Sequence, residues 1–531
     1  MGVSSTVAHW TAETAVPLDL RSVGQVVRDN AATAPDRPAL VWGTDEGLRR
    51  WTWSELLAEA ESFAQRVLTV AEPGEVVAIF ASNSPDWVFF EYGAALAGIT
   101  FTAINTALAD AEVVHVLETS RARAVFADAD HRGSPLFDRT CRLAPDRAVY
   151  DLARWRELEP AGTALPNVDA ASALLIQFTS GTTGRPKGAV LSHRAAYNCG
   201  RYQNERMGIT GTDNWLNALP LHHVGGSICV LLSMLSVGGT TTLAPGFDAG
   251  AILSLAATSR ATVIGLVPTM QLALLEHPDF YRTDLSSLRL VSSGGSVVPT
   301  SLIVRVEAAL DAVVVNAYGQ SESPSAIMTS PADTDEVKAH TIGRPLPHRE
   351  VTIALADGTT ATFGEIGELL MRSPLTMDAY IDRADEGRTL SDDGWLHTGD
   401  LCSMDEAGVI SIHGRVRDVI IRGGENIYPA EVEDVMLRHP NVADVAVLGL
   451  PDHRWGEVPV ACYRPSVLGP APDAALIEFA RESLAGFKVP RRWVAMDSFP
   501  LTPAGKVKKF ILQQRLIDGD EAATAHRTEP A

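Results

Sequence analysis

The sequence predicts an α/β protein with a large N-terminal domain of layered sheets and a small α+β domain at the C-terminus. Apolar runs typical of buried strands alternate with segments of helical spacing up to about residue 345, a pattern that favours largely parallel sheets covered by helices. Beyond that point the expected strands become shorter and turns more frequent. The pattern of expected strands and helices changes again at Gly414. A chain of 531 residues is also too long for a single core.

The alternation of expected strands and helices lies in the first part of the chain. Helices are expected at residues 23–32, from Thr52 or Ser54 as a cap, and from Ser84 to Ala97. The longest apolar stretch, 228–237, is too short to span a bilayer and predicts a buried helix. Strands are expected at 39–42, 74–80, 124–126, 173–178, 241–243, 261–264, 288–291 and 313–315.

The C-terminal part has a different pattern. Short strands are expected at 351–353 and 368–370, and after Gly414 strands at 418–421, 445–448 and 459–462 combine with helices at 430–439 and 474–484. These elements predict a small α+β unit. Residues 518–531 are polar and are expected to be disordered.

Composition narrows the class of protein. The net charge of −21 argues against a general nucleic-acid-binding protein, which would show a basic surface. The five cysteines are far apart, with neither metal-ligand nor CxxC spacing, which favours free thiols in a reducing cytoplasm. The first ten residues lack the features of a signal peptide. We therefore expect a cytoplasmic protein that is not integral to a membrane. A monomer and a homodimer are both open, because the sequence does not give the oligomeric state.

The most informative stretch is Thr179-Ser180-Gly181-Thr182-Thr183-Gly184-Arg185-Pro186-Lys187-Gly188, which follows a buried strand. Glycines allow close backbone approach, successive N–H groups can bind an anion, and hydroxyls and Lys187 add donors and charge. This is the chemistry of a polyphosphate site. It differs from a Walker A loop, because Pro186 precedes the lysine and Gly188 follows it. The alternative, a surface linker, is disfavoured by the strand in front.

Further motifs follow in the first domain. His222 and His223 lie on a turn bounded by proline and glycine, where a structural and a ligand-facing role are equally open. The segment 292–296 follows a strand and is either a tight turn or a place where backbone passes a flat ligand such as adenine. At the end of another strand, Tyr318 offers a stacking face, and Ser321 and Glu322 offer oxygens to Mg²⁺.

Motifs nearer the C-terminus complete the set. Asp400 is expected at a strand end, where a carboxylate can accept both ribose hydroxyls. The segment 414–418 is a domain boundary and a possible hinge. Gly423 and Gly424 suggest close approach to a second ligand, and Lys506 lies on a turn bearing Pro503 and Gly505.

In their order and spacing, these segments resemble the ANL superfamily of adenylate-forming enzymes, over nearly the whole chain from Thr52 to Lys506. The resemblance implies an N-terminal adenylation domain (1–415) and a mobile C-terminal lid (416–531) with its hinge at Arg417. It also implies two half-reactions: a carboxylate and MgATP give an acyl-adenylate and pyrophosphate, and a thiol, that of CoA, then displaces AMP.

The resemblance assigns roles to individual residues. Residues 179–187 hold the β- and γ-phosphates, Ser321 binds phosphate, and Glu322 binds Mg²⁺. Lys506 bridges the carboxylate and the α-phosphate, and His223 gates the acyl pocket. Gly423 and Gly424 approach the pantetheine thiol. Gly294, Gly295 and Tyr318 flank adenine, and Asp400 and Arg415 take the ribose. Ser296 and Gly319 are further nucleotide-binding positions.

Three positions depart from the pattern of the family. Ser321 replaces the usual threonine and keeps its hydroxyl. Arg417 replaces the usual lysine or aspartate at the hinge. His222 stands where many acyl-CoA synthetases have an aromatic residue, which bears on the mouth of the pocket.

The expected acyl pocket is mostly small or apolar. It has no Arg or Lys for a second carboxylate and no Asp for an α-amino group, which favours a fatty, aryl or alicyclic monocarboxylate. Its members are His222, His223, Val267, Pro268, Gly294, Gly295, Ala317 and the 323–326 loop with Pro324.

The leading hypothesis is therefore an AMP-forming acyl-CoA synthetase that uses ATP, Mg²⁺ and CoA. The first alternative loads a carrier protein's phosphopantetheine instead, and a narrower one performs only one half-reaction. A non-catalytic scaffold is disfavoured by the retained Lys187, Glu322, Asp400, Arg415 and Lys506. Luciferase-like oxygen chemistry shares the adenylation step and is not separated by motif.

Overall fold

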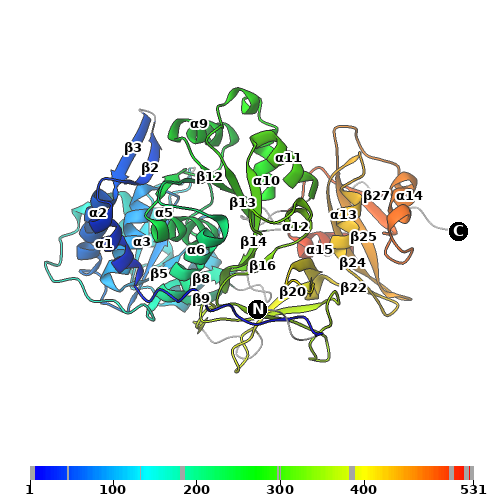
Figure 1. The fold of residues 1–531 in the computed structure, drawn as a ribbon, viewed down its shortest axis with the longest axis horizontal. Coiled ribbons are helices and arrows are strands. Elements are labelled where there is room, and N and C mark those ends of the chain that lie inside the picture. The colour runs from blue at the N-terminus through cyan, green and yellow to red at the C-terminus, as the bar shows by residue number, and fades with distance from the viewer. Residues whose placement is uncertain are drawn as a thin grey trace. The chain divides into compact units, whose positions relative to one another are not determined.

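The computed structural model describes residues 6–44, 47–131, 133–179, 186–295, 298, 300–381, 389–500, 507–519 and 525–526 (Figure 1). The chain divides into two compact units. The first comprises Trp10–Val351 and Leu370–His397, and the second comprises Met1–His9, Thr352–Leu369 and Thr398–Ala531. The expected mixed α/β architecture is confirmed. The functional boundary expected at residues 415/416 stays a prediction.

The first unit contains a nine-stranded sheet. Its central strands are parallel, as the alternating pattern predicts, and antiparallel strands β3, β15 and β16 lie toward its two edges. The spatial order is β16 (Arg344–Pro345), β15 (Ser323–Met328), β14 (Val313–Gln320), β13 (Leu290–Gly294), β12 (Val263–Leu266), β10 (Asn214–Asn217), β11 (Thr240–Leu243), β2 (Pro38–Thr44) and β3 (Gly47–Thr52).

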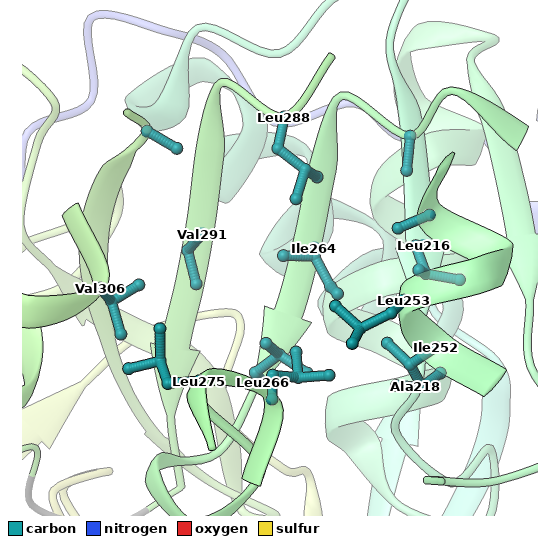
Figure 2. Close-up of a cluster of buried hydrophobic side chains, with 14 of the residues drawn as sticks. Leu216, Ala218, Ile252, Leu253, Ile264, Leu266, Leu275, Leu288, Val291 and Val306 are labelled. Carbon is teal, nitrogen blue, oxygen red and sulfur yellow. The ribbon is translucent and has the colours of Figure 1, made fainter. Parts of the chain in front are cut away.

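Three helices cover one face of this sheet, namely α9 (Ala249–Ser259), α10 (Pro268–Leu275) and α11 (Thr300–Leu310). Figure 2 shows Leu253 and Ile252 of α9 near Ile264 of β12, and Leu275 below Val291 of β13. Because strand side chains alternate between faces, this core fixes Ile264 and Leu266 on the helix side and turns Gly265 to the opposite face. Trp215 of β10, which lies beside Gly265, is likewise on that opposite face.

The first unit also contains a seven-stranded sheet. Strands β8, β5, β4, β6 and β7 are parallel, and β9 and β19 continue the sheet in antiparallel pairings. The spatial order is β19 (Ala379–Tyr380), β9 (Lys187–Ser192), β8 (Ala173–Thr179), β5 (Thr100–Ala103), β4 (Val76–Phe80), β6 (Ala124–Ala127) and β7 (Ala148–Asp151).

Local capping explains where the helices begin. Thr52 and Glu55 form a capping box at the start of α2 (Trp53–Val67), which confirms the expected cap. Ser84 caps α3 (Pro85–Ala97), whose residues from Trp87 onward are all buried. Ser192 caps α6 (His193–Met207). The apolar stretch from 228 forms a π-helix, η2 (Ser227–Leu232), which continues as α8 (Ser233–Val237). The expected buried helix is therefore present, and its first half has the wider π-helical turn.

The second unit contains a six-stranded sheet, in which β22, β25, β26 and β24 surround one core with α13 (Pro429–Met436) and α14 (Asp473–Ser483). This is the expected α+β architecture. The strands are β22 (Ile420–Arg422), β23 (Glu425–Ile427), β24 (Val442–Asp452), β25 (Gly456–Pro465), β26 (Arg492–Ala495) and β27 (Ala525–His526).

Two expectations for this unit are corrected. Asp418 lies in a short 3-10 turn, Val416–Asp418, so the strand begins only at Ile420. Asp518 ends helix α15 (Lys509–Asp518), and Ala525–His526 pairs with β26, so disorder does not extend over the whole of 518–531.

A five-stranded sheet, most of whose residues belong to the second unit, precedes the six-stranded one along the chain. Its order is β1 (His9–Trp10), β17 (Glu350–Ala354), β18 (Gly367–Arg372), β20 (Leu396–Met404) and β21 (Ile410–Arg415). In the part of the chain that the structure describes, no helix is both long and apolar enough to cross a bilayer.

Candidate active site

The glycine- and hydroxyl-rich segment connects two adjacent antiparallel strands. Thr179, the last residue of β8, is paired with Lys187, the first residue of β9. The ends of the segment are therefore held side by side by sheet hydrogen bonds. Five predicted phosphate-binding residues lie outside the described residues: Ser180, Gly181, Thr182, Thr183 and Gly184.

Lys187 and Glu322 converge on a residue that the sequence analysis missed. The Tyr380 hydroxyl donates a hydrogen bond of 2.6 Å to Glu322 Oε1, and the Lys187 ammonium lies 5.4 Å from the centroid of the Tyr380 ring. Glu322 and Tyr380 are both buried, with 9% and 8% of their surface exposed. No sequence signal marks Tyr380, because it lies 58 residues from Glu322 in a turn-rich region.

Glu322 and Ser321 form the turn between β14 and β15, where Gln320 pairs with Ser323. As expected, the segment 316–322 ends a strand, and β14 extends to Gln320, beyond the predicted 313–315. Tyr318 is almost fully buried and is paired with Ile327. Gly319 packs against the backbone of the hairpin, where an added Cβ would lie 2.4 Å from Ser325 N.

Gly294 is the last residue of β13 rather than following it, and Gly295 comes directly after the strand. A Cβ at Gly294 would lie 2.5 Å from the Ala317 carbonyl oxygen, so only glycine permits this strand spacing. Gly295 has a φ of +81°, and a Cβ there would lie 3.5 Å from Val267 Cγ1. The parallel strands β12, β13 and β14 thus bring Val267, Gly294, Gly295 and Ala317 to one edge of the sheet. Ser296 lies outside the described residues.

The two histidines have different environments. Burial, reinforced by the proximity of His223 and His131, lowers the pKa of His222 to about 3, so its ring is neutral at physiological pH. The amide of Gln177 in β8 donates to the His222 carbonyl oxygen at 3.2 Å. His223 caps helix α7 (Val224–Gly226), and its Nδ1 accepts a hydrogen bond from Gly225 N.

The remaining residues of the expected acyl pocket lie at or near the ends of helices and strands. Pro268 is the first residue of α10 and follows Val267, which precedes the helix. Pro324 belongs to β15, and its carbonyl oxygen accepts a hydrogen bond from the buried Arg349. Each of these backbones is therefore fixed by regular structure.

In the second unit, Asp400 and Arg415 are directly paired across strands β20 and β21. Arg415 Nε lies 3.0 Å from Asp400 Oδ1, and Asp400 is buried. Asp400 occupies the middle of β20, which corrects the expectation of a strand end. The structure thus brings the two predicted ribose-binding residues together.

Gly423 and Gly424 form the two-residue turn between β22 and β23, with φ values of +61° and +90°. Such hairpin turns favour glycine at both positions, which gives these residues a conformational reason independent of any ligand. Arg417, the predicted hinge residue, is exposed and lies 3.5 Å from Asp418. Lys506 lies outside the described residues.

Among the described residues, no group of three or more His, Cys, Asp or Glu side chains is arranged to hold a metal ion. A single carboxylate nevertheless suits Mg²⁺, which takes one or two carboxylates together with substrate phosphates. Glu322 fits this requirement, because its second carboxylate oxygen has no hydrogen-bond partner in the described part of the chain.

Comparison with known proteins matches both units. The model of the AMP-binding enzyme family matches residues 27–381, and that of the AMP-binding enzyme C-terminal domain matches residues 431–506. Indoleacetate–CoA ligase of Aromatoleum aromaticum is 36% identical over 451 residues, covering 82% of this chain and 88% of its own. A (7a-methyl-1,5-dioxo-octahydro-1H-inden-4-yl)propanoyl:CoA ligase of Rhodococcus jostii is 33% identical over 501 residues, covering 88% and 94%.

Solved structures agree with the sequence matches. ATP-bound MatB from Rhodopseudomonas palustris superimposes with a TM-score of 0.86 at 26% identity, over 94% of this chain and 99% of that one. The anthranilate CoA ligase AuaEII in complex with anthranoyl-AMP gives the same TM-score at 25% identity, over 95% and 99%.

Proposed function

The chain belongs to the AMP-binding enzyme family, and we propose that it is an AMP-forming acyl-CoA ligase whose substrate is an apolar monocarboxylate. ATP-dependent acid–CoA ligation is the activity common to its named relatives. The observation that carries the proposal is the convergence of Lys187 and Glu322 on Tyr380, which gives one tyrosine contacts to a cation and to an anion at the end of the predicted phosphate-binding segment.

The chemistry of the reaction requires both charges. A carboxylate is a poor electrophile, and adenylation gives it a good leaving group. The attack brings two anions together, so cationic groups must neutralise the charge that develops. In this proposal Lys187 faces the phosphates and Glu322 contributes an oxygen to Mg²⁺, which screens the triphosphate when bound. Lys506 bridges the carboxylate and the α-phosphate.

The nucleotide and thiol positions follow the same assignment. Thr179 and the residues up to Gly184 take the phosphates with Ser321. Asp400 and Arg415, which form a 3.0 Å ion pair, take the ribose. CoA approaches Gly423 and Gly424, Arg417 is the hinge, and a cytoplasmic location stays a prediction. Adenine lies against Gly294, Gly295 and Tyr318, and Ser296 and Gly319 are further nucleotide-binding positions.

The class of acyl group follows from the lack of charged side chains in the proposed acyl pocket. His222 is neutral because of its lowered pKa, and Val267, Pro268, Ala317 and Pro324 are uncharged. These residues, with His223 as the gate, offer no partner for a second carboxylate or an amino group. Indoleacetate, feruloyl and long-chain fatty acyl groups, named for three relatives, are all of this class.

The test is carboxylate-dependent exchange of pyrophosphate into ATP, without CoA, across a panel of fatty, aryl, alicyclic, dicarboxylic and amino acids. We expect exchange with one class of apolar monocarboxylate, and CoA-dependent product without any carrier protein. Exchange only with amino acids or dicarboxylates would overturn the substrate assignment. Product formation that requires a carrier protein would favour the carrier-loading alternative.

Lys506→Ala separates the two half-reactions. We expect adenylation to fall about 10²–10³-fold, as when one transition-state donor is removed, while CoA thiolysis of a supplied acyl-adenylate is largely retained. Equal loss in both half-reactions would contradict the assignment of Lys506 to adenylation.

A further inference from the structure

Tyr380 connects the two large sheets of the first unit at the candidate site. It belongs to β19, at the edge of the seven-stranded sheet, and its hydroxyl reaches Glu322 in the β14–β15 turn of the nine-stranded sheet. We infer that Tyr380 is a positioning residue that holds Glu322 and Lys187 for binding of a magnesium–triphosphate complex. This inference rests on the proposed function.

The backbone around Tyr380 is fixed on both sides. Asp378 N donates to Val190 O at 2.9 Å and Ile381 N donates to Gly188 O at 2.8 Å, which ties the segment to the strand that begins at Lys187. Met377 N donates to Glu322 O at 2.7 Å, which ties the same segment to the hairpin turn. The ring therefore has a fixed relation to both charged residues before any ligand binds.

The hydroxyl acts on only one carboxylate oxygen. Glu322 Oε1 accepts the hydrogen bond, and the other oxygen has no hydrogen-bond partner in the described residues. A glutamate side chain loses considerable rotamer freedom when it is fixed, so fixing it in advance lowers the cost of ligand binding. A neutral phenol does this without cancelling the negative charge that Mg²⁺ requires. Partners that orient metal-binding carboxylates commonly act in this way.

The ring acts on the cation. Lys187 Nζ lies 5.4 Å from the ring centroid, within the range of a cation–π contact. Among the described residues, the side-chain contact of Glu322 is the hydrogen bond from Tyr380, and no ion pair joins its carboxylate to Lys187. Tyr380 therefore contacts both opposite charges, and in this inference the Lys187 ammonium faces phosphate oxygens and the Glu322 carboxylate faces the metal.

Tyr380→Phe tests the hydroxyl alone, because it retains the ring beside Lys187. We would measure Mn²⁺ affinity by electron paramagnetic resonance of free Mn²⁺, in the presence of a non-hydrolysable ATP analogue, together with the Mg²⁺ dependence of pyrophosphate exchange. We expect Mn²⁺ affinity to fall about 10–100-fold and the half-maximal Mg²⁺ concentration to rise by a similar factor. The KM for the carboxylate should not change.

Tyr202→Phe is the matched control. Tyr202 is a buried tyrosine of the same unit whose hydroxyl donates to the Pro17 carbonyl oxygen at 3.1 Å, so its removal costs a buried hydrogen bond away from the site. We expect Mn²⁺ affinity to match that of the wild type. Equal losses in both variants would assign Tyr380 a merely structural role, and unchanged Mn²⁺ affinity in Tyr380→Phe would overturn the inference.

Tyr380→Leu tests the ring. With the metal removed by chelation, we expect it to bind the ATP analogue about 2–5-fold more weakly than Tyr380→Phe, the effect of one cation–π contact. Equal binding by the two variants would overturn the role assigned to the ring. If the proposed function itself is wrong, the result is different: the wild-type protein shows neither carboxylate-dependent pyrophosphate exchange nor nucleotide-dependent Mn²⁺ binding.

Discussion

The Ser227 hydroxyl donates a hydrogen bond of 2.7 Å to Oε1 of Glu91, a carboxyl group with no exposed surface. Glu91 lies in the part of helix α3 from Trp87 onward, which is buried throughout, and Ser227 is the first residue of the π-helix η2. Glu91 Oε2 and the nearby Trp87 Nε1 have no hydrogen-bond partner within 3.5 Å in the described structure. An acidic group in such surroundings is costly when ionised.

This burial makes the stability of the protein depend on pH. Desolvation, opposed by the Ser227 hydrogen bond, raises the pKa of Glu91 to about 7 from 4.5. Between these values the unfolded chain releases a proton that the folded chain retains, so stability is lost as the pH rises through this window. At about 1.4 kcal/mol per pKa unit, the cost above pH 7 is about 3 kcal/mol.

Glu91→Gln should remove this cost while keeping the shape of the side chain and its acceptor for Ser227. We expect the variant to be close to the wild type at pH 5 and about 3 kcal/mol more stable at pH 8, measured by denaturant unfolding. Glu118→Gln, on an exposed residue, is the control and should have the same effect at both pH values. A pH-independent difference for Glu91→Gln would contradict the prediction.

Arg349 is a second buried charge with a structural role. The residue is 1% exposed, and its guanidinium donates to Ser373 Oγ at 2.7 Å, to Pro324 O at 3.1 Å and to Cys199 Sγ at 3.1 Å. It thus joins α6 and the loop after β18 to the hairpin strand that follows Glu322. Arg349→Met would leave the Pro324 carbonyl oxygen without this donor.

We expect Arg349→Met to lower the free energy of unfolding by about 3 kcal/mol, because hydrogen bonds from a charged donor are lost and buried acceptors remain. Arg154→Met is the control, since Arg154 and its partner Glu157 are more than 60% exposed and such pairs contribute little. Denaturant unfolding monitored by circular dichroism measures both. Equal effects of the two substitutions would show that the Arg349 contacts are not stabilising.

The low pKa of His222 predicts acid sensitivity. Burial lowers this pKa to about 3 from 6.5, so the unfolded chain binds a proton that the folded chain does not as the pH falls below 6.5. Stability contributed at neutral pH is therefore lost on acidification. His222→Phe removes the titrating group and should shift the midpoint of acid unfolding to lower pH. The exposed His340→Phe is the control, and the same midpoint in His222→Phe and wild type would contradict the assignment.

The sequence predicts local features well because they depend on neighbours along the chain. The capping residues Thr52 and Ser84 and the parallel strands are where alternation and capping chemistry place them. Asp400 and Arg415 were both predicted, although only the β20–β21 register explains why they meet. The ends of the elements were predicted less accurately, because β13 extends to include Gly294 and β14 extends to include Tyr318.

The tertiary contacts could not be predicted in the same way. Tyr380 acts through a two-residue strand, too short to leave a periodic pattern, and its partner lies 58 residues away. The Ser227–Glu91 hydrogen bond spans 136 residues. In that case one signal existed, since Glu91 is an acid within the otherwise mostly apolar helix at residues 87–97, but burial of the whole helix is visible only in the fold.

Gly294 provides a prediction about both stability and nucleotide binding. An added Cβ would lie 2.5 Å from the Ala317 carbonyl oxygen, a backbone atom that cannot move without separating β13 from β14. We expect Gly294→Ala to destabilise the protein by about 1–3 kcal/mol, the usual cost of overpacking. Because the same strand end is proposed to face adenine, the KM for ATP should rise as well.

Gly250→Ala is the control for this substitution. Gly250 lies in helix α9, and a Cβ there would meet the imidazole tip of His277 at 3.1 Å and Asp248 Oδ1 at 3.6 Å, an ordinary van der Waals distance. Alanine in a helix is favoured over glycine by up to about 1 kcal/mol, so this variant should be as stable as the wild type or more stable. If Gly294→Ala behaved like Gly250→Ala in both unfolding and ATP titration, the close approach of β13 to Ala317 would have no role in the site. If stability fell but the KM for ATP did not change, the glycine would serve strand packing alone.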